Sequence, residues 1–242
     1  MLPTLFISDL HLCPARPQSR EHFLTFVDGT AQNADALYIL GDLFEYWAGD
    51  DDLGDPFNAD ICAGLRRLAD RGVKTYFMAG NRDFLLGEKF AAAAGLHLLA
   101  EPHRADVAGV PTLMLHGDAL CTDDIDYQRF RATVRSPNWS RAFLGEPLTV
   151  RKARIEALRR ESEAASRSKP MALMDVVPEA VANLLQQFDT PPRLIHGHTH
   201  RPACHRLTVA GKSCERWVLP AWDIRPGFLV VDGAGCRPVA IA

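Results

Sequence analysis

Short apolar runs rich in β-branched and aromatic residues recur along most of the chain, and Gly, Asp or Asn residues bound each of them. Such runs predict strands, which we place at residues 4–7, 37–40, 75–78, 112–115 and 193–195. Between the early runs, apolar residues recur at spacings of three and four over residues 22–32 and 56–71, which predicts helices. Because strands alternate with helices, we expect a largely parallel sheet whose ligand sites gather at the carboxyl ends of its strands.

The pattern changes after His200. Apolar runs at residues 214–219 and 227–231 follow one another with turns but without a helix between them, which indicates antiparallel strands or a second sheet. We therefore predict an α/β fold in a single domain over residues 1–242, with two layered sheets.

Residues 123–170 also interrupt the alternation of strands and helices. Residues 125–134 and 150–168 have helical patterns, and Pro170 should end the second helix because the residue before a proline is driven out of the α region. We expect this segment to be a helical insertion that rises from the strand-end face of the domain and forms a lid.

Size and composition exclude several classes of protein. With 242 residues the chain can bury a sizeable core, and its 47% apolar and 24% charged residues exclude a disordered chain. The sequence has no run of eighteen apolar residues that would span a membrane. It also lacks a basic region before its first apolar run, so we do not expect a secretory signal. The six cysteines show no CxxC spacing, and we expect them to be free packing thiols.

The formal net charge of −3 hides a basic stretch. Residues 129–169 contain eleven Lys or Arg and four Glu, so this stretch carries +7 and the rest of the chain −10. A surface of this kind suits phosphate, an anionic lipid surface or nucleic acid, and it is equally typical of a solvated helical face.

Each predicted strand of the first part ends in Asp, Asn or His side chains, which are ligands for divalent cations. The candidate metal ligands are Asp9, His11, Asp42, Asn81, His116, His196 and His198. Asp9 and His11 alternate along the chain, so they can face one ion only if the backbone turns there. Asp42 follows Gly41 and is placed to bridge two ions. Oxygen and nitrogen ligands without thiolates favour Mn²⁺, Fe²⁺ or Zn²⁺ over a Ca²⁺ cage, and the joint pattern predicts a two-metal hydrolase.

Five motifs resemble the signature of the calcineurin-like metallophosphoesterases, and the resemblance covers the whole chain. They are Asp9-Leu10-His11, Gly41-Asp42, Gly80-Asn81-Arg82-Asp83, His116-Gly117-Asp118 and Gly197-His198-Thr199-His200. The resemblance implies a layered α/β/β/α sandwich. It also implies that Asp9, His11, Asp42 and His198 hold one metal ion, and that Asp42, Asn81, His116 and His196 hold the second. A hydroxide activated by both ions would attack phosphorus, with catalytic roles for Asp42, Asn81, Arg82 and His116.

Arg82 departs from the wider superfamily, which usually has at this position a histidine that assists the leaving group as an acid. An arginine stays protonated, so it is a poor proton donor but a good phosphate clamp. We therefore expect a leaving group that needs little protonation, such as a phosphate monoester released from a pyrophosphate. Phosphoprotein phosphatase activity is correspondingly disfavoured.

Longer stretches at residues 41–52, 124–131 and 174–176 resemble the UDP-2,3-diacylglucosamine pyrophosphatases of lipid A biosynthesis. These enzymes release UMP and 2,3-diacylglucosamine 1-phosphate (lipid X), and the resemblance implies attack on the α-phosphorus. It implies two Mn²⁺ ions, a lipid-linked UDP-sugar substrate, and a cytoplasmic monomer peripheral to the anionic face of the inner membrane, without a nucleic-acid partner. The implied substrate contacts are Asn81, Arg82, Asp124, Ser162, Ser166, Lys169 and His196.

Part of this contact set has support from the residues themselves, and several alternatives stay open. Ser162, Ser166 and Lys169 share one face of the predicted helix, as members of a substrate site or of a solvated face. Ser166 stands where the family commonly has Asn. The protein could instead act on soluble nucleotide pyrophosphates or cyclic nucleotides, or be a catalytically silent scaffold.

The aromatic residues of the insertion and an acidic run before it also need an interpretation. The aromatic residues of the insertion, Phe130, Trp139 and Phe143, line an apolar cleft for acyl chains, form a small core of the insertion, or do both. We interpret the acidic run at residues 50–52 as a solvated loop.

Overall fold

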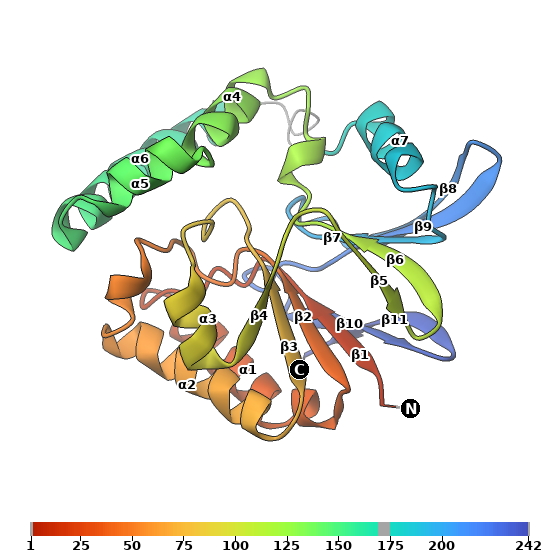
Figure 1. The fold of residues 1–242 in the computed structure, drawn as a ribbon, viewed down its shortest axis with the longest axis horizontal. Coiled ribbons are helices and arrows are strands. Elements are labelled where there is room, and N and C mark those ends of the chain that lie inside the picture. The colour runs from red at the N-terminus through yellow and green to blue at the C-terminus, as the bar shows by residue number, and fades with distance from the viewer. Residues whose placement is uncertain (1, 169–174, 242) are drawn as a thin grey trace.

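The computed structural model describes residues 2–168 and 175–241, with the helix backbone alone over residues 161–168. Two β-sheets face one another and helices cover their outer sides (Figure 1). The first sheet has the strand order β11-β10-β1-β2-β3-β4. Four of its strands are parallel, namely β1 (Thr4–Ile7), β2 (Ala36–Leu40), β3 (Lys74–Met78) and β4 (Leu96–Leu99). The antiparallel strands β10 (Gly227–Asp232) and β11 (Gly235–Ala240) complete it.

The second sheet has the strand order β5-β6-β7-β9-β8. Its central strands β6 (Val110–Met114), β7 (Arg193–His196) and β9 (Lys212–Val218) are parallel. The edge strands β5 (His103–Val107) and β8 (Ala203–Val209) are antiparallel to their neighbours. The register pairs Ile7 with Ile39, Leu40 with Met78, and Met114 with Ile195, so the residues that follow these strands emerge at a shared edge.

Apolar residues on both faces of the first sheet form the core. On one face Phe6, Tyr38 and Met78 pack against Leu113 and Leu194 of the second sheet. On the other face the alternate residues of the same strands pack beneath α1 (Pro17–Asp28), α2 (Pro56–Asp70) and α3 (Glu88–Ala94). Helix α7 (Pro178–Gln187) packs Val181 and Leu185 onto the second sheet. The predicted α/β/β/α layering is therefore confirmed.

The structure changes several predicted elements. The first helix begins at Pro17 instead of residue 22, because proline fits the first helical turn, where its missing N–H leaves no bond unmade. It ends at Asp28, before Gly29. Helix α3 and the strands β4 and β5, none of which we predict, have between four and seven residues each. Such short elements carry too little periodicity to be recognised and form because the neighbouring sheet supports them.

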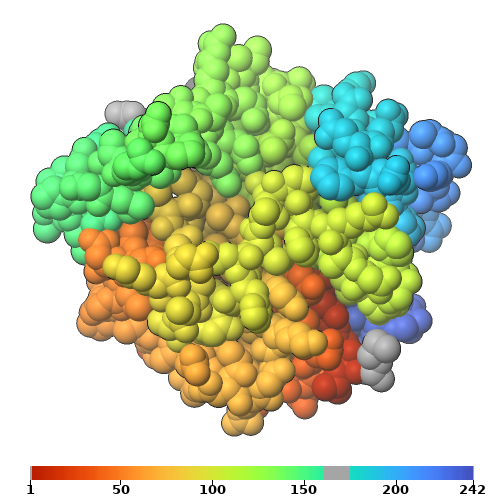
Figure 2. Space-filling view, viewed as in Figure 1, coloured from red at the N-terminus to blue at the C-terminus, as the bar shows by residue number. Residues whose placement is uncertain are grey.

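In the part of the chain that the structure describes, three α-helices lie between β6 and α7, and we call them the insertion: α4 (Ile125–Val134), α5 (Pro137–Leu144) and α6 (Leu148–Ser168). The side chains of Asp124 and Ser136 accept backbone N–H bonds and cap α4 and α5. Helices α4 and α6 agree with the prediction, whereas α5 lies between the two predicted helices, where we predicted no element. The insertion lies across the strand-exit face of the first sheet (Figures 1 and 2).

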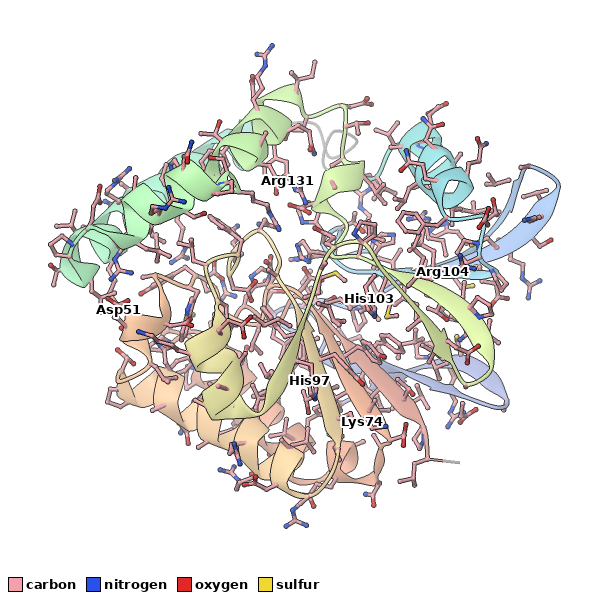
Figure 3. The ribbon with its side chains drawn as sticks, in the orientation of Figure 1. Asp51, Lys74, His97, His103, Arg104 and Arg131 are labelled. Atoms are coloured by element: carbon pink, nitrogen blue, oxygen red, sulfur yellow. The ribbon has the colours of Figure 1, made fainter. Side chains whose placement is uncertain are left out.

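Ion pairs hold both ends of the insertion on the rest of the molecule, which we call the body. At one end Arg131 of α4 donates to Asp118 at 2.8 Å and to Glu101 at 2.9 Å. At the other end the buried Arg151 of α6 donates to Asp51 and to the carbonyl of Ala48. Figure 3 labels Arg131 and Asp51 at these two positions. Arg135, Lys152 and Arg159 also pair with carboxylates of the body, so part of the basic stretch is not a solvated face.

The acidic run at residues 50–52 is not a solvated loop either. Asp50 accepts the backbone N–H groups of Gly87, Lys89 and Phe90 at the start of α3, at 2.9 to 3.1 Å. Helix N-termini expose such unpaired donors, so a carboxylate is stabilised there. Asp52 is buried and lies 2.6 Å from Nζ of Lys152. The run thus anchors both α3 and the insertion.

Candidate metal centre

The backbone after β1 runs beside the backbone after β2. The N–H of Asp9 donates to the carbonyl of Gly41 at 3.1 Å, and the N–H of His11 donates to the carbonyl of Asp42 at 3.0 Å. Asp9, His11 and Asp42 have φ values of 53°, 48° and 53°, in the left-handed region that costs a non-glycine residue energy. This turn brings the side chains of Asp9 and His11 to one side, as the alternation in the sequence requires.

A first group of ligand atoms consists of Asp9, His11 and His200. Nε2 of His11 lies 3.3 Å from Nε2 of His200, which in turn lies 3.5 Å from Oδ1 of Asp9. His200 also has a left-handed backbone, with φ 55°. We did not predict His200 as a ligand, although it stands in the Gly-His-Thr-His motif that we used.

Asp42 lies between this group and a second one. Its Oδ2 is 3.9 Å from Nε2 of His11 and 3.7 Å from Nε2 of His116. Nε2 of His116 also lies 2.9 Å from Oδ1 of Asn81. Nδ1 of His116 donates to the carbonyl of Leu40 at 2.8 Å, which fixes the ring and directs Nε2 toward Asp42 and Asn81.

The two remaining histidines of the predicted ligand set are His196 and His198. The ring of His198 lies 5.1 Å from the ring of His116, beside the second group, and the backbone N–H of His198 donates to Oδ2 of Asp9, in the first group, at 2.9 Å. His196 is completely buried, and both of its ring nitrogens have other partners. Its Nδ1 donates to the carbonyl of Gly197 at 2.9 Å, and its Nε2 accepts from Arg216 at 3.0 Å. The role of His196 as a metal and substrate ligand stays a prediction.

The electrostatics of the two groups suit cations. Burial lowers the pKa of His11 to about 3, so its ring is neutral and offers a lone pair at neutral pH. Burial, together with the charges of Asp83 and Asp9, raises the pKa of Asp42 to about 7. Despite burial, the charges of Asp42 and Asp9 raise the pKa of His116 to about 9, so its ring carries a proton that a metal ion would displace. Oδ2 of Asp42 lies 3.9 Å from Nε2 of His11 and 3.7 Å from Nε2 of His116, an arrangement that a divalent cation would stabilise.

Two glycines allow this close packing. A Cβ atom on Gly80 would overlap the carboxylate and backbone nitrogen of Asp42, and a Cβ atom on Gly197 would overlap the side chains of Ser8 and Asp9. Glycine is therefore required at positions 80 and 197, because the backbone there lies against the carboxylates of Asp42 and Asp9.

The family model for calcineurin-like phosphoesterases matches residues 2–202 of the chain. The chain belongs to the calcineurin-like phosphoesterase family. It is 51% identical to a UDP-2,3-diacylglucosamine hydrolase of Aromatoleum aromaticum, over 99% of this chain and 97% of the relative. It is 48% identical to one of Klebsiella pneumoniae, over 91% of each chain. Its fold resembles that of a dimetal phosphatase from Danio rerio, with a TM-score of 0.52, 12% identity, and 100% and 99% of the two chains covered.

A cavity of about 450 Å³ adjoins the metal centre of this phosphoesterase. It lies between the insertion and the body, and Tyr46, Phe130 and Trp139 are among its apolar walls. Asn81 and Arg82 line the same cavity. The Nε atom of Arg82 is buried and has no hydrogen-bond partner among the described residues. It is therefore available to a ligand. Phe143 packs into the main core and also lines the cavity, and a role of this cavity in binding acyl chains stays a prediction.

The other predicted substrate contacts have a mixed outcome. Asp124 caps α4 by accepting from the N–H of Tyr127 at 3.1 Å. Ser162 and Ser166 lie in α6, where only the backbone is described, and Lys169 lies outside the described residues. The six cysteines form no disulfide with one another, as predicted.

Asp83 has a role in this phosphoesterase that the sequence analysis missed. It is completely buried, and its carboxylate accepts four backbone N–H groups, from Gly80 at 2.8 Å, Leu43 at 2.7 Å, Asp42 at 3.3 Å and Phe44 at 3.4 Å. It thereby ties the loop after β3 to the loop after β2. The only sign of this role in the sequence was the place of Asp83 in the Gly-Asn-Arg-Asp motif. Three of the N–H groups that it accepts belong to residues about 40 positions earlier in the chain, so the spacing could not reveal them.

We predict that Asp83→Ala strongly destabilises the protein even without metal. Four buried N–H groups lose their acceptor, and each unsatisfied group costs about 1–3 kcal/mol, so we expect a total loss of at least ~3 kcal/mol. Urea unfolding in EDTA measures this loss. Asp60→Ala is the control, because it breaks a half-exposed pair with Arg20 that is worth about 0–1 kcal/mol. Equal losses in the two variants would contradict the role of Asp83.

Proposed function

We propose that this phosphoesterase hydrolyses the pyrophosphate bond of UDP-2,3-diacylglucosamine and releases UMP and 2,3-diacylglucosamine 1-phosphate in lipid A biosynthesis. One observation carries the proposal. Asn81 and Arg82 belong both to the metal centre and to the wall of the apolar cavity, so a pyrophosphate at the metals leaves its acyl chains in the cavity. The names of the full-length relatives agree with this substrate.

For the metals we propose two Mn²⁺ ions, and we set a second ligand set beside the predicted one. Asp9, His11, Asp42 and His200 would hold the first, and Asp42, Asn81, His116 and His198 the second. The contacts that support this choice are the His200–His11 and His200–Asp9 approaches and the engagement of His196 by Arg216. Bound there, the cations would lower the pKa of a water molecule and neutralise charge on the pyrophosphate oxygens.

The catalytic side chains that we propose are Asp42, Asn81, Arg82 and His116. The backbone N–H of Arg82 donates to Oδ1 of Asp42 at 2.8 Å, which keeps Oδ2 directed at both groups of ligands. The guanidinium of Arg82 faces the cavity and would bind the pyrophosphate oxygens as a permanent cation. Because it donates no proton, the reaction suits departure of a phosphate monoester, with attack at the α-phosphorus.

The insertion acts in this proposal as the lid over the substrate, with the predicted bounds 123–170. Its cavity-facing side would receive the acyl chains, and the predicted contacts of Asp124, Ser162, Ser166 and Lys169 would meet the sugar phosphate. Ion pairs tie both ends of the insertion to the body. The lid would therefore be fixed in place and would not open about a hinge.

We further propose that the protein is a cytoplasmic monomer that docks on the inner membrane through the insertion. Ile125, Leu144 and Val150 expose 59%, 42% and 44% of their surface on the insertion, and apolar side chains exposed beside basic ones suit contact with a lipid surface. Arg129 and Arg141 add positive charge that suits an anionic lipid surface. Among the described residues no helix has the length and apolar composition of a membrane span, so docking would be peripheral.

The substrate is tested with purified protein, Mn²⁺ and oxygen-labelled water. We expect UMP and 2,3-diacylglucosamine 1-phosphate as products, with the label in UMP. We also expect kcat/KM to exceed that for UDP-N-acetylglucosamine at least about a hundredfold, since burial of only a few acyl CH₂ groups supplies the ~2.7 kcal/mol required. Equal activity on both compounds would refute the lipid substrate and favour a soluble nucleotide pyrophosphate.

The ligand set is tested by the pair His200→Gln and His196→Gln. We expect His200→Gln to weaken Mn²⁺ binding in calorimetry by at least about tenfold, because even residues that only orient ligands are worth 10- to 100-fold. His196→Gln should retain the Mn²⁺ affinity of the wild type within about threefold, because His196 is not a metal ligand in the second set. Circular dichroism confirms folding of each variant. The reverse order of affinities would restore the predicted set with His196.

Membrane docking is tested by co-sedimentation with vesicles that contain phosphatidylglycerol. The double variant Ile125→Ser/Leu144→Ser should partition at least about tenfold less, because each lost apolar contact is worth about 1 kcal/mol or more. Leu98→Ser/Ile224→Ser, which removes exposed apolar residues outside the insertion, is the matched control and should sediment like the wild type. Equal partitioning of the two double variants counts against this surface.

A further inference from the structure

Glu45 lies three residues beyond Asp42, in the loop that pairs with the loop after β1. Its backbone N–H donates to the carbonyl of Leu12 at 3.1 Å. Only 4% of the residue is exposed. A carboxylate this deeply buried is unfavourable unless cations or hydrogen-bond donors surround it.

Three arginines from separate segments surround this carboxylate. Oε1 lies 3.2 Å from Nη2 of Arg159 on α6 and 3.9 Å from Nη1 of Arg82. Oε2 lies 3.1 Å from Nη2 of Arg16, which precedes α1. Arg82 comes from the loop after β3, so one carboxylate joins the insertion to two loops of the body. Without it, Arg82 and Arg159 would repel one another across the cavity that both line.

The same carboxylate faces a histidine of the metal centre from behind. Oε2 of Glu45 lies 3.6 Å from Nδ1 of His11, while Nε2 of His11 points to His200 and Asp42. Metal-binding histidines characteristically present one ring nitrogen to the ion and the other to a carboxylate, which fixes the ring and raises its basicity. Glu45 stands where that carboxylate is needed.

We infer that Glu45 is a positioning residue that couples the lid to the metal centre. It orients His11, a proposed ligand of the first metal, and it holds the cations of Arg82 and Arg159 together in the substrate cavity, aimed at an anionic group. This inference rests on the proposed function for the identity of that anion, a pyrophosphate. The position of α6 and the geometry of His11 are thereby linked through a single side chain.

The test compares Glu45→Gln, which keeps the shape of the side chain and removes its charge, with Asp52→Asn. Asp52 is an equally buried carboxylate that holds the same helix through Lys152, and no contact to His11 or Arg82 is recorded for it among the described residues. Three quantities are measured: Mn²⁺ affinity by calorimetry, amide hydrogen exchange over residues 148–160, and kcat and KM with saturating Mn²⁺.

We expect Glu45→Gln to weaken Mn²⁺ binding about 10- to 100-fold, the range seen when a carboxylate behind a metal-bound histidine is lost. It should also lower kcat with saturating metal, because Arg82 loses its orientation. Asp52→Asn should leave Mn²⁺ affinity and kcat within about twofold of the wild type. Both variants should speed exchange in α6, since both remove an anchor of that helix.

Wild-type Mn²⁺ affinity and kcat in Glu45→Gln would overturn the inference, as would equal losses of affinity in the two variants. If Glu45→Gln does not fold, Glu45→Asp replaces it, because it keeps the charge but withdraws it from His11 and Arg159, and the same weakening is expected. The metal and exchange measurements need no substrate. They therefore decide the inference even if the assay with UDP-2,3-diacylglucosamine refutes the proposed function.

Discussion

The pairing of two loops beyond the ends of β1 and β2 is the constraint on which the site depends. It forces left-handed backbone on Asp9, His11 and Asp42, a conformation that is unfavourable for residues with a Cβ atom. The buried carboxylate of Asp83 holds the second loop by four N–H bonds, and Gly80 leaves room for Asp42. The strain is thus retained because the surroundings allow no other arrangement.

Carboxylates of the body perform a second task, which is to hold the insertion. The arginines of α4 form ion pairs with Asp118 and Glu101. The basic residues of α6 form ion pairs with Asp51, Asp52 and Glu45. The negative charge of the body and the positive charge of the insertion therefore complement one another across the cavity. Glu101 also accepts the N–H of His116 at 2.7 Å, so the anchoring of α4 reaches a proposed metal ligand. The insertion and the candidate metal centre are parts of one network of charges.

Much of this arrangement follows from local pattern. The sequence patterns of strands β1, β2, β3, β6 and β7 and of helices α2, α4 and α6 are clear, and the change of pattern after His200 indicated the second sheet. The position of Asp9, Asp42 and Asn81 at strand exits follows from the parallel order of the strands. Elements such as α3 and β4 escaped because they are too short to show a period. The acidic run at residues 50–52 was misread because its partners, the N-terminus of α3 and the residues of α6, lie about 35 to 100 positions further along the chain.

The sequence by itself determined which residue types gather at the strand ends, and with them the chemistry of a divalent metal centre. Only the tertiary structure decided which histidine faces which group. His196, His198 and His200 alternate along one short segment, and sequence spacing does not say which of them turn toward Asp9. The left-handed backbone at His198 and His200 and the contact of Arg216 with His196 make that choice. The physical reason is that ring direction depends on φ and on a partner from another strand, and neither is encoded in the spacing of the motif.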